Sequence, residues 1–320
     1  MKKTIALLEA IKPGTYIEDY TRVYDEEELN QLVGVLQKIL YSPSCLRGYL
    51  QEHGITIVPS NYYSEIPTIE DIKNSFIGGE TKYCEGLFNN ELMLKYLSEL
   101  HEYSCEFNPP KDDNGSGGYF WNAPMYSYSD AMSYYCVIRK EKPSNVIEIG
   151  SGFSSLVAIE ALSANGYGNL TCIEPYPREF IAKSDKINLI QIRAEHIEPE
   201  EINEILSDGD ILFIDSTHTV KHGSDCLNIY LNIIPAINKR VHIHVHDIKL
   251  PYTWDLNSLR DRQIFWTEQY LLGAYLLDND KIKVTYSSNY HYHKNKRELT
   301  ESMHGKYNAG GASLWFTKNP

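Results

Sequence analysis

An apolar run that ends in a glycine turn constrains the fold more than any other feature of the chain. Residues 146–149 (Val-Ile-Glu-Ile) place one acid among apolar side chains, as expected of a buried strand. Gly150 and Gly152 follow, and glycine lets a backbone turn sharply and approach a ligand closely. Ser155 occupies the position of the third glycine in the dinucleotide-binding fingerprint. The pattern predicts a strand, a tight turn with a nucleotide-type cofactor, and a helix.

The acid within this strand, Glu148, discriminates between the cofactors that use such a turn. We expect its carboxylate to face the crevice beside the turn, where it would repel a pyrophosphate. The same carboxylate would suit a ligand that carries an ammonium and a sulfonium group. The residues therefore favour S-adenosylmethionine (SAM) over NAD.

The size and charge of the chain limit its domain count and its partners. Its 320 residues exceed the roughly 100–200 of a common domain, which predicts one large domain plus an extension. The formal net charge of −13 argues against nucleic acid, because such binding depends on clustered Lys and Arg. A small molecule or a neutral glycan is the expected partner, and a homo-oligomer stays possible.

Membrane and secretion signals are weak in this sequence. No stretch approaches the roughly 20 apolar residues of a membrane span. The apolar run near the first residue ends at Glu9, which is too soon for a signal peptide. The six cysteines lack Cys-x-x-Cys spacing, which favours reduced thiols. We therefore expect a cytoplasmic protein.

Two regions of different pattern meet at a Gly-, Pro- and Asp-rich loop, residues 108–118. Residues 1–118 show mainly helical periodicity, and we expect them to form an acceptor pocket or an oligomer contact. In residues 119–320 strands and helices alternate, which predicts a doubly wound α/β fold with a seven-stranded, mostly parallel sheet. We predict helices near 154–165, 221–236 and 257–277, a lid near 119–122, and strands at 145–149, 169–174, 187–193, 210–215, 241–246, 281–287 and 312–317.

Acids follow the second and third predicted strands, at the end of the sheet where such folds bind ligands. Glu174 lies about 20 residues beyond the glycine turn, where an acid can accept hydrogen bonds from both ribose hydroxyls. Glu195 is similarly placed to contact an adenine amino group. The start of a surface helix explains Glu195 equally well.

The fourth predicted strand leads to the candidate reaction centre. Residues 211–214 (Ile-Leu-Phe-Ile) are apolar throughout, which indicates a strand buried on both faces. Asp215 follows directly, and His218 comes three residues later. A neutral imidazole is the usual base for a hydroxyl or amine proton, so we predict His218 as the base, with Asp215 orienting it or sharing a metal. A helix cap is the structural alternative for Asp215.

The fifth predicted strand alternates histidine with apolar residues from Val241 onward. Strict alternation puts His242, His244 and His246 on one face. We expect the first two to be hydrogen-bonded core residues. His246 and Asp247 reach the strand end, where they could join Asp215 in a divalent-metal site for Mg²⁺ or a similar ion. Metal-free substrate binding or catalysis by these residues is the alternative.

Several segments together resemble class I SAM-dependent methyltransferases, and more narrowly a bacterial subgroup associated with surface-polysaccharide or secondary-metabolite genes. The resemblance covers roughly residues 55–320. The segments that carry it are residues 59–67, 119–122, 148–152, 213–218, 244–248, 266–272 and 311–315.

The resemblance implies roles for particular residues. Glu148, Gly150 and Gly152, with Ser151 between the glycines, would surround the methionine part of SAM, and Glu174 would bind the ribose. Apart from the resemblance, the end of the fourth predicted strand brings Asp215 to the crevice, where we expect it to contact the cofactor as well. A related group of metal-dependent O-methyltransferases carries metal ligands at positions that match Asp215, His246 and Asp247. That group usually has two adjacent acids at the later position, whereas this chain has His-Asp.

We expect from these observations an enzyme that transfers the methyl group of SAM to a hydroxyl of a sugar or small metabolite. Asp215, His218 and His246 are the predicted catalytic residues. The amino-terminal region and residues 250–270 are expected to shape the acceptor pocket. Two alternatives stay open: a SAM-binding regulator or scaffold without transfer activity, and an NAD-dependent oxidoreductase.

Overall fold

The computed structural model describes residues 26–77 and 81–320 of the chain. The Cα positions of these residues divide into two compact units, one made of residues 26–77 together with 255–265, the other of 81–254 together with 266–320. The domain boundary predicted after Gly118 remains a prediction. None of the helices in the described residues is long and apolar enough to cross a membrane.

The smaller unit is helical in its described residues. It contains α2 (Glu26–Leu40), α3 (Ser44–Glu52), α4 (Ile69–Ser75) and α12 (Leu256–Arg260). Thr68 and Asp71 form a reciprocal capping box at the start of α4. Asp255 caps α12 by accepting a hydrogen bond from the amide of Ser258. In the residues that the structure describes, the predicted helical character of the amino-terminal region is confirmed.

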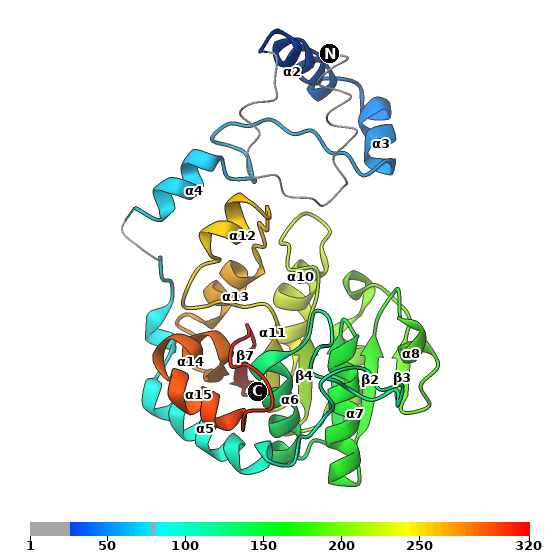
Figure 1. Cartoon of the computed structure of the whole chain (residues 1–320). Helices are drawn as coiled ribbons and strands as arrows, with labels where there is room; N and C mark the ends of the chain where they lie inside the picture. The colour runs from blue at the N-terminus through cyan, green and yellow to red at the C-terminus, as the bar shows by residue number, and fades with distance from the viewer. Residues whose placement is uncertain (1–25, 78–80) are drawn as a thin grey trace. The chain divides into compact units, whose positions relative to one another are not determined.

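The larger unit is built on a seven-stranded sheet in the order β3-β2-β1-β4-β5-β7-β6 (Figure 1). Strands β1 to β5 are parallel, and β7 runs antiparallel to both of its neighbours. This confirms the predicted doubly wound, mostly parallel fold. The strands are β1 (Asn145–Ile149), β2 (Asn169–Ile173), β3 (Ile187–Ile190), β4 (Ile211–Ile214), β5 (Val241–Val245), β6 (Ile282–Ser287) and β7 (Leu314–Lys318).

Helices cover both faces of the sheet, and each face has its own apolar core. One core includes side chains of α5 (Asn90–Ser104), α6 (Tyr128–Glu141) and α7 (Phe153–Asn165). The other includes side chains of α9 (Pro199–Ile205), α11 (Ile234–Ala236) and α13 (Glu268–Leu276). The remaining α-helices in the described part of this unit are α8 (Glu179–Ala182), α10 (Asp225–Asn228), α14 (Ser288–Lys294) and α15 (Lys296–Ser302). Two 3₁₀-helices, η1 (Glu85–Leu87) and η2 (Ala194–His196), and a π-helix, η3 (Ile229–Ile233), also belong to it.

Two of the structural expectations were wrong. The helix predicted over 257–277 is two helices, α12 and α13, because the segment between them is held by tertiary bonds: the amides of Thr267 and Glu268 both donate to the carbonyl of His218. The predicted lid residues Tyr119 and Trp121 are 1% and 2% exposed, because they pack in the core beside α6 and α7.

The alternation along β1 decides which side chains can reach the ligand edge. Ile147 and Ile149 point into the core that α9 and α13 cover. Val146 belongs to the opposite core, and Glu148 shares its side because side chains alternate along a strand. The order of strands reverses between β1 and β4, and a crevice at such a switch point is the usual ligand site of open α/β sheets.

Candidate active site

The turn after β1 requires glycine at position 150. Gly150 has φ +83°, and a Cβ there would lie 1.9 Å from the carbonyl oxygen of Asp215. Its amide donates to the carbonyl of Ile173, so the turn is joined to β2. Gly152 differs, because its φ of −176° is ordinary extended backbone and nothing lies within 4 Å of a Cβ. Gly150 thus maintains the turn, while Gly152 leaves space open.

Glu148 does not face the crevice as we expected. Its side chain is fully buried, and its carboxylate accepts hydrogen bonds from Tyr134, at 2.9 Å, and from Ser155. Burial raises the pKa of Glu148 to about 7. The hydrogen bonds from the two hydroxyls lower the pKa, but by less than burial raises it. The predicted orientation is wrong because strand alternation sends Glu148 into the core. Ser155, at the fingerprint's third glycine position, supports this buried acid.

Two cavities meet beside the turn. One of about 340 Å³ is lined by Glu174, Glu195 and Asp215, among others. The other, of about 120 Å³, is lined by Ser151 and Gly152. Both cavities share three lining residues, which come from the ends of β1, β2 and β4: Gly150, Glu174 and Asp215. The structure therefore brings the predicted cofactor residues together, with the exception of Glu148.

Glu174 and Glu195, two of the acids that line the larger cavity, are held differently. The carboxylate of Glu174 accepts hydrogen bonds from the amides of Ser151, at 3.2 Å, and Tyr176, at 2.8 Å. Glu195 forms an ion pair with Arg193, 2.6 Å between Oε1 and Nη2. Glu174 is thus fixed by backbone contacts next to the glycine turn, whereas Glu195 is fixed by a neighbouring side chain.

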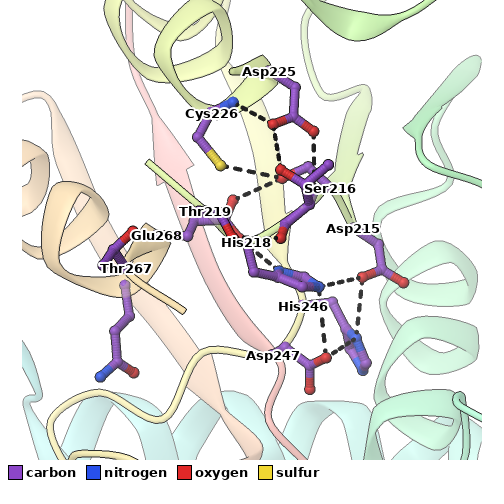
Figure 2. A network of polar contacts seen from close by, with 12 residues as sticks. Asp215, Ser216, His218, Thr219, Asp225, Cys226, His246, Asp247, Thr267 and Glu268 are labelled. Atoms are coloured by element: carbon purple, nitrogen blue, oxygen red, sulfur yellow. Dashed lines mark hydrogen bonds and ion pairs between the residues drawn. The ribbon is translucent and has the colours of Figure 1, made fainter. Parts of the chain in front are cut away.

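Next to this junction, two acids and two histidines form a polar centre (Figure 2). Asp215 Oδ1 lies 3.3 Å from His218 Nε2 and 3.4 Å from His246 Nδ1. Asp247 Oδ2 lies 3.6 Å from His218 Nε2 and 3.7 Å from His246 Nδ1. Although burial opposes its ionisation, these imidazoles hold the pKa of Asp215 far below its usual range. The structure brings together all four residues that the sequence singled out here.

His218 faces carboxylates through both ring nitrogens. Its Nδ1 lies 2.7 Å from Oε2 of Glu268, and its ring packs against Trp266. Burial favours the neutral ring, but the bonds to Asp215 and Glu268 outweigh it and raise the pKa of His218 to about 10. A base has to be neutral to accept a proton, so this carboxylate environment acts against the role predicted for His218.

His246 is held from behind in a similar way. Its Nε2 lies 3.3 Å from Oδ2 of Asp130 on α6. Asp130 is buried and also accepts hydrogen bonds from Ser288 and the amides of Ala312 and Ser313. Despite burial, the surrounding carboxylates raise the pKa of His246 well above its usual value. Asp130 therefore orients the ring so that Nδ1 faces the polar centre.

The two histidines within β5, His242 and His244, are buried in the core, as expected. His244 is fully buried, stacks on Phe213 and contacts Ser313 Oγ through Nε2 at 2.7 Å. Burial lowers the pKa of His244 well below its usual value. His242 pairs with Glu141 at 3.3 Å. Neither reaches the carboxyl end of the strand.

Comparison with known proteins assigns the central part of the chain. Residues 147–248, which run from β1 past β5, match the family model of a methyltransferase domain. These residues form a methyltransferase domain. The predicted family is confirmed at this level.

The methyltransferase domain has similar proteins among curated sequences and solved structures. An uncharacterized protein of Archaeoglobus fulgidus is 29% identical over 146 residues, or 42% of this chain. The match spans 64% of that relative, less than two thirds of its length. An O-methyltransferase of Streptomyces achromogenes solved with SAM is 14% identical, with 73% of this chain and 91% of that chain covered at TM-score 0.39. An O-methyltransferase of Bacillus cereus solved with S-adenosylhomocysteine (SAH) is 11% identical, with 74% of this chain and 94% of that chain covered at TM-score 0.37.

Three residues of the methyltransferase domain have the chemistry of a metal site. Ligand atoms of Asp215, His246 and Asp247 lie within 4.8 Å of one another. The two carboxylates are 31% and 28% exposed, and Nδ1 of His246 is buried without a hydrogen-bond partner in the described residues. Carboxylate oxygen and imidazole nitrogen both suit a divalent cation. The residues present therefore fit the predicted metal.

Sequence reasoning missed two residues of the methyltransferase site, Asp130 and Glu268. Glu268 lies four and eight positions before Leu272 and Leu276, on the buried stripe of α13. Asp130 is the second residue of the buried segment of α6, in which residues 129–138 are all buried. An acid within an apolar helical stripe was the available signal, because a buried carboxylate needs a partner.

Proposed function

We propose that the methyltransferase domain transfers the methyl group from SAM to a hydroxyl of a sugar or small metabolite. The observation that carries the proposal is the junction at which Gly150, Glu174 and Asp215 line both cavities. These residues come from the ends of three adjacent parallel strands at the switch point, where α/β sheets bind ligands. When bound, SAM supplies a methyl group already activated on a sulfonium.

The two cavities suggest how the chain binds the cofactor. Glu174 would accept hydrogen bonds from the ribose, and Glu195 would lie near the adenine in the larger cavity. Gly150, Ser151 and Gly152 would surround the methionine part in the smaller one. Glu148 would act from within the core, by supporting Ser155 and the turn rather than by contacting the ligand.

The polar centre favours an acceptor that must lose a proton. A neutral hydroxyl is a weak nucleophile, and a nearby base or cation makes it a stronger one. Asp215, His218 and His246 are the proposed catalytic residues, because they converge beside the shared junction. Since the pKa values of both histidines are raised, either imidazole would accept the proton only in its minor neutral form. Precise positioning of the acceptor would supply much of the rate.

We also propose a divalent cation at Asp215, His246 and Asp247, since these ligand atoms already converge. A bound cation would lower the pKa of an acceptor hydroxyl. Asp130 would hold His246 with Nδ1 toward the ion, as carboxylates behind metal-bound histidines do. The carboxylates of Asp215 and Asp247 would supply the negative charge of the site.

We also propose where the protein acts and what kind of acceptor it takes. All six cysteines are free, which is in keeping with a reducing compartment such as the cytoplasm. The acceptor would be a small molecule or glycan, given the net charge of −13. The amino-terminal region and residues 250–270 are proposed to shape its pocket, and a polysaccharide pathway and a homo-oligomer belong to the same proposal.

The direct experiment is incubation with methyl-labelled SAM and a panel of sugars and small hydroxylated metabolites. We expect label on an acceptor oxygen, and we expect His218→Ala to bind SAM normally while losing about 100-fold or more in turnover. Normal turnover of that variant would remove His218 from the mechanism. SAM binding without any transfer would favour the scaffold alternative, and thermal stabilisation by NAD but not SAH would favour the oxidoreductase.

A further inference from the structure

The smaller cavity has a charge distribution that the proposed function does not yet explain. It has a volume of about 120 Å³ and lies against the first residues of α7. Of the described residues that line it, Arg178 carries the only positive charge. Two carboxylates, those of Glu174 and Asp215, line the same cavity. A small space with both signs of charge is complementary to a zwitterion.

We propose that Arg178 binds the α-carboxylate of the amino-acid part of SAM, an assignment that rests on the proposed function. Guanidinium groups recognise carboxylates with two parallel hydrogen bonds, which gives both affinity and orientation. The ligand class for this cavity is thus a free α-amino acid group attached to a nucleoside.

The local structure holds Arg178 at the edge of the cavity. Its guanidinium lies over the ring of Phe153, the first residue of α7, with 5.3 Å to the ring centroid. Its Nη2 is 3.9 Å from Sδ of Met125, another lining residue. Its carbonyl accepts hydrogen bonds from the amides of Ile181 and Ala182 in α8. Backbone and side chain are therefore both anchored beside the glycine turn.

The sequence between Glu174 and Arg178 limits the movement of the arginine. Pro175 and Pro177 flank Tyr176 in this segment, and proline fixes the backbone angle φ. The amide of Tyr176 donates to Glu174 Oε1 at 2.8 Å, so the acid at one end of the segment is bound to its middle. One short, stiff loop thus presents the proposed ribose ligand and the proposed carboxylate ligand to adjacent cavities.

The cavity also offers partners for both charges of an amino-acid group. The first amides of a helix have no partner within that helix, so the start of α7 adds positive potential on the side of Arg178. Glu174 and Asp215 supply acceptors for an ammonium group. Glu148, which the sequence suggested for that ammonium, is buried away from the cavity.

The test compares two ligands that differ in the amino-acid group. SAH carries it, whereas 5′-methylthioadenosine keeps the adenosine and sulfur without it. Dissociation constants of both are measured by calorimetry for the wild type, Arg178→Met, Arg178→Lys and the control Arg297→Met, an exposed arginine on α15. We expect Arg178→Met to raise the dissociation constant of SAH about tenfold or more, and that of methylthioadenosine by less than about twofold. Arg178→Lys should recover part of the loss, and Arg297→Met should match the wild type.

Two results would overturn the assignment while leaving the proposed function intact: unchanged SAH affinity in Arg178→Met, or equal losses for both ligands. Equal losses would mean that Arg178 acts on the adenosine part or on the fold, and thermal unfolding of the variant would separate these two causes. A wild-type protein that binds neither ligand would overturn the proposed function, and this assignment with it.

Discussion

His218 Nδ1 lies 2.7 Å from Oε2 of Glu268, a carboxylate whose residue is only 1% exposed. Glu268 also accepts hydrogen bonds from Tyr230 at 2.8 Å and Ser216 at 3.3 Å, so three side chains fix its position. The ring of His218 is oriented by this contact, with Nε2 toward Asp215. His246 has the same relationship with Asp130. Both imidazoles of the polar centre are thus held by buried carboxylates.

Replacing Glu268 by Gln should slow turnover without weakening the binding of SAM. The substitution keeps the shape of the side chain but removes the charge that holds the His218 ring. We expect kcat to fall by about 10- to 100-fold, the range found for residues that orient site ligands. The affinity for SAH should stay within about twofold, since Glu268 is not among the lining residues of either cavity. Unchanged kcat in a folded variant would show that orientation by Glu268 is dispensable.

Replacing Glu174 by Ala should weaken cofactor binding. The proposed hydrogen bonds to the ribose involve a charged acceptor, and their loss should raise the dissociation constant of SAH by about tenfold or more. Glu179→Ala is the matched control, because this acid of α8 is 79% exposed and forms a surface ion pair with Lys183. Calorimetry measures the dissociation constant of SAH for both variants. Equal constants for Glu174→Ala and Glu179→Ala would show that Glu174 does not bind the cofactor.

The two glycines of the turn should respond differently to alanine. Gly150→Ala should lower the unfolding free energy by about 3 kcal/mol or more, because φ is positive there and the added Cβ would lie 1.9 Å from the carbonyl oxygen of Asp215. At Gly152, with extended backbone and open space, we expect less than about 1 kcal/mol. Denaturant unfolding measures both. Similar losses at the two positions would contradict the geometry of the turn.

Glu148 should make stability depend on pH. Burial raises its pKa from an ordinary value of 4.5 to about 7 in the folded protein. The folded state therefore keeps a proton that the unfolded chain has lost, and this contribution to stability is full below pH 4.5 and lost as the pH rises to 7.

The test of this dependence is the difference in unfolding free energy between the wild type and Glu148→Gln, in which other titrating groups cancel. The wild type should lose about 3 kcal/mol at most relative to the variant between pH 4.5 and 7. A difference that does not vary with pH would mean that Glu148 is ionised throughout.

Removal of divalent metal should reduce turnover if the proposed ion takes part. We expect a chelator to lower kcat by about tenfold or more and added Mg²⁺ or Mn²⁺ to restore it. Asp247→Asn should show the same loss without rescue, because one ligand is absent. Full turnover after chelation, with SAM binding intact, would assign Asp215, His246 and Asp247 to metal-free chemistry.

Much of the fold followed from local patterns. Apolar runs such as 211–214 located the strands, and the glycine turn located the switch point. The grouping of Gly150, Glu174 and Asp215 then follows from topology, since the carboxyl ends of parallel strands meet at one edge. These features are local or topological, which is why they could be predicted.

Other features depend on contacts that no local pattern specifies. Alternation puts Glu148 and Ile149 on opposite faces of β1, but only the packed structure shows that Ile149 lines the cavity and Glu148 does not. Glu268 is 50 positions from His218 in the sequence. Its place on the buried side of a helix indicates that it has a polar partner, but the sequence does not show which residue that is. The break between α12 and α13 likewise depends on the distant carbonyl of His218.

A crystal structure of the protein grown with SAH tests the central claim most directly. The account predicts adenosine in the larger cavity, with the ribose hydroxyls on Glu174, and the thioether beside Gly150 and Asp215. A crevice that stays empty at saturating SAH, or that takes up the diphosphate of NAD instead, would contradict it.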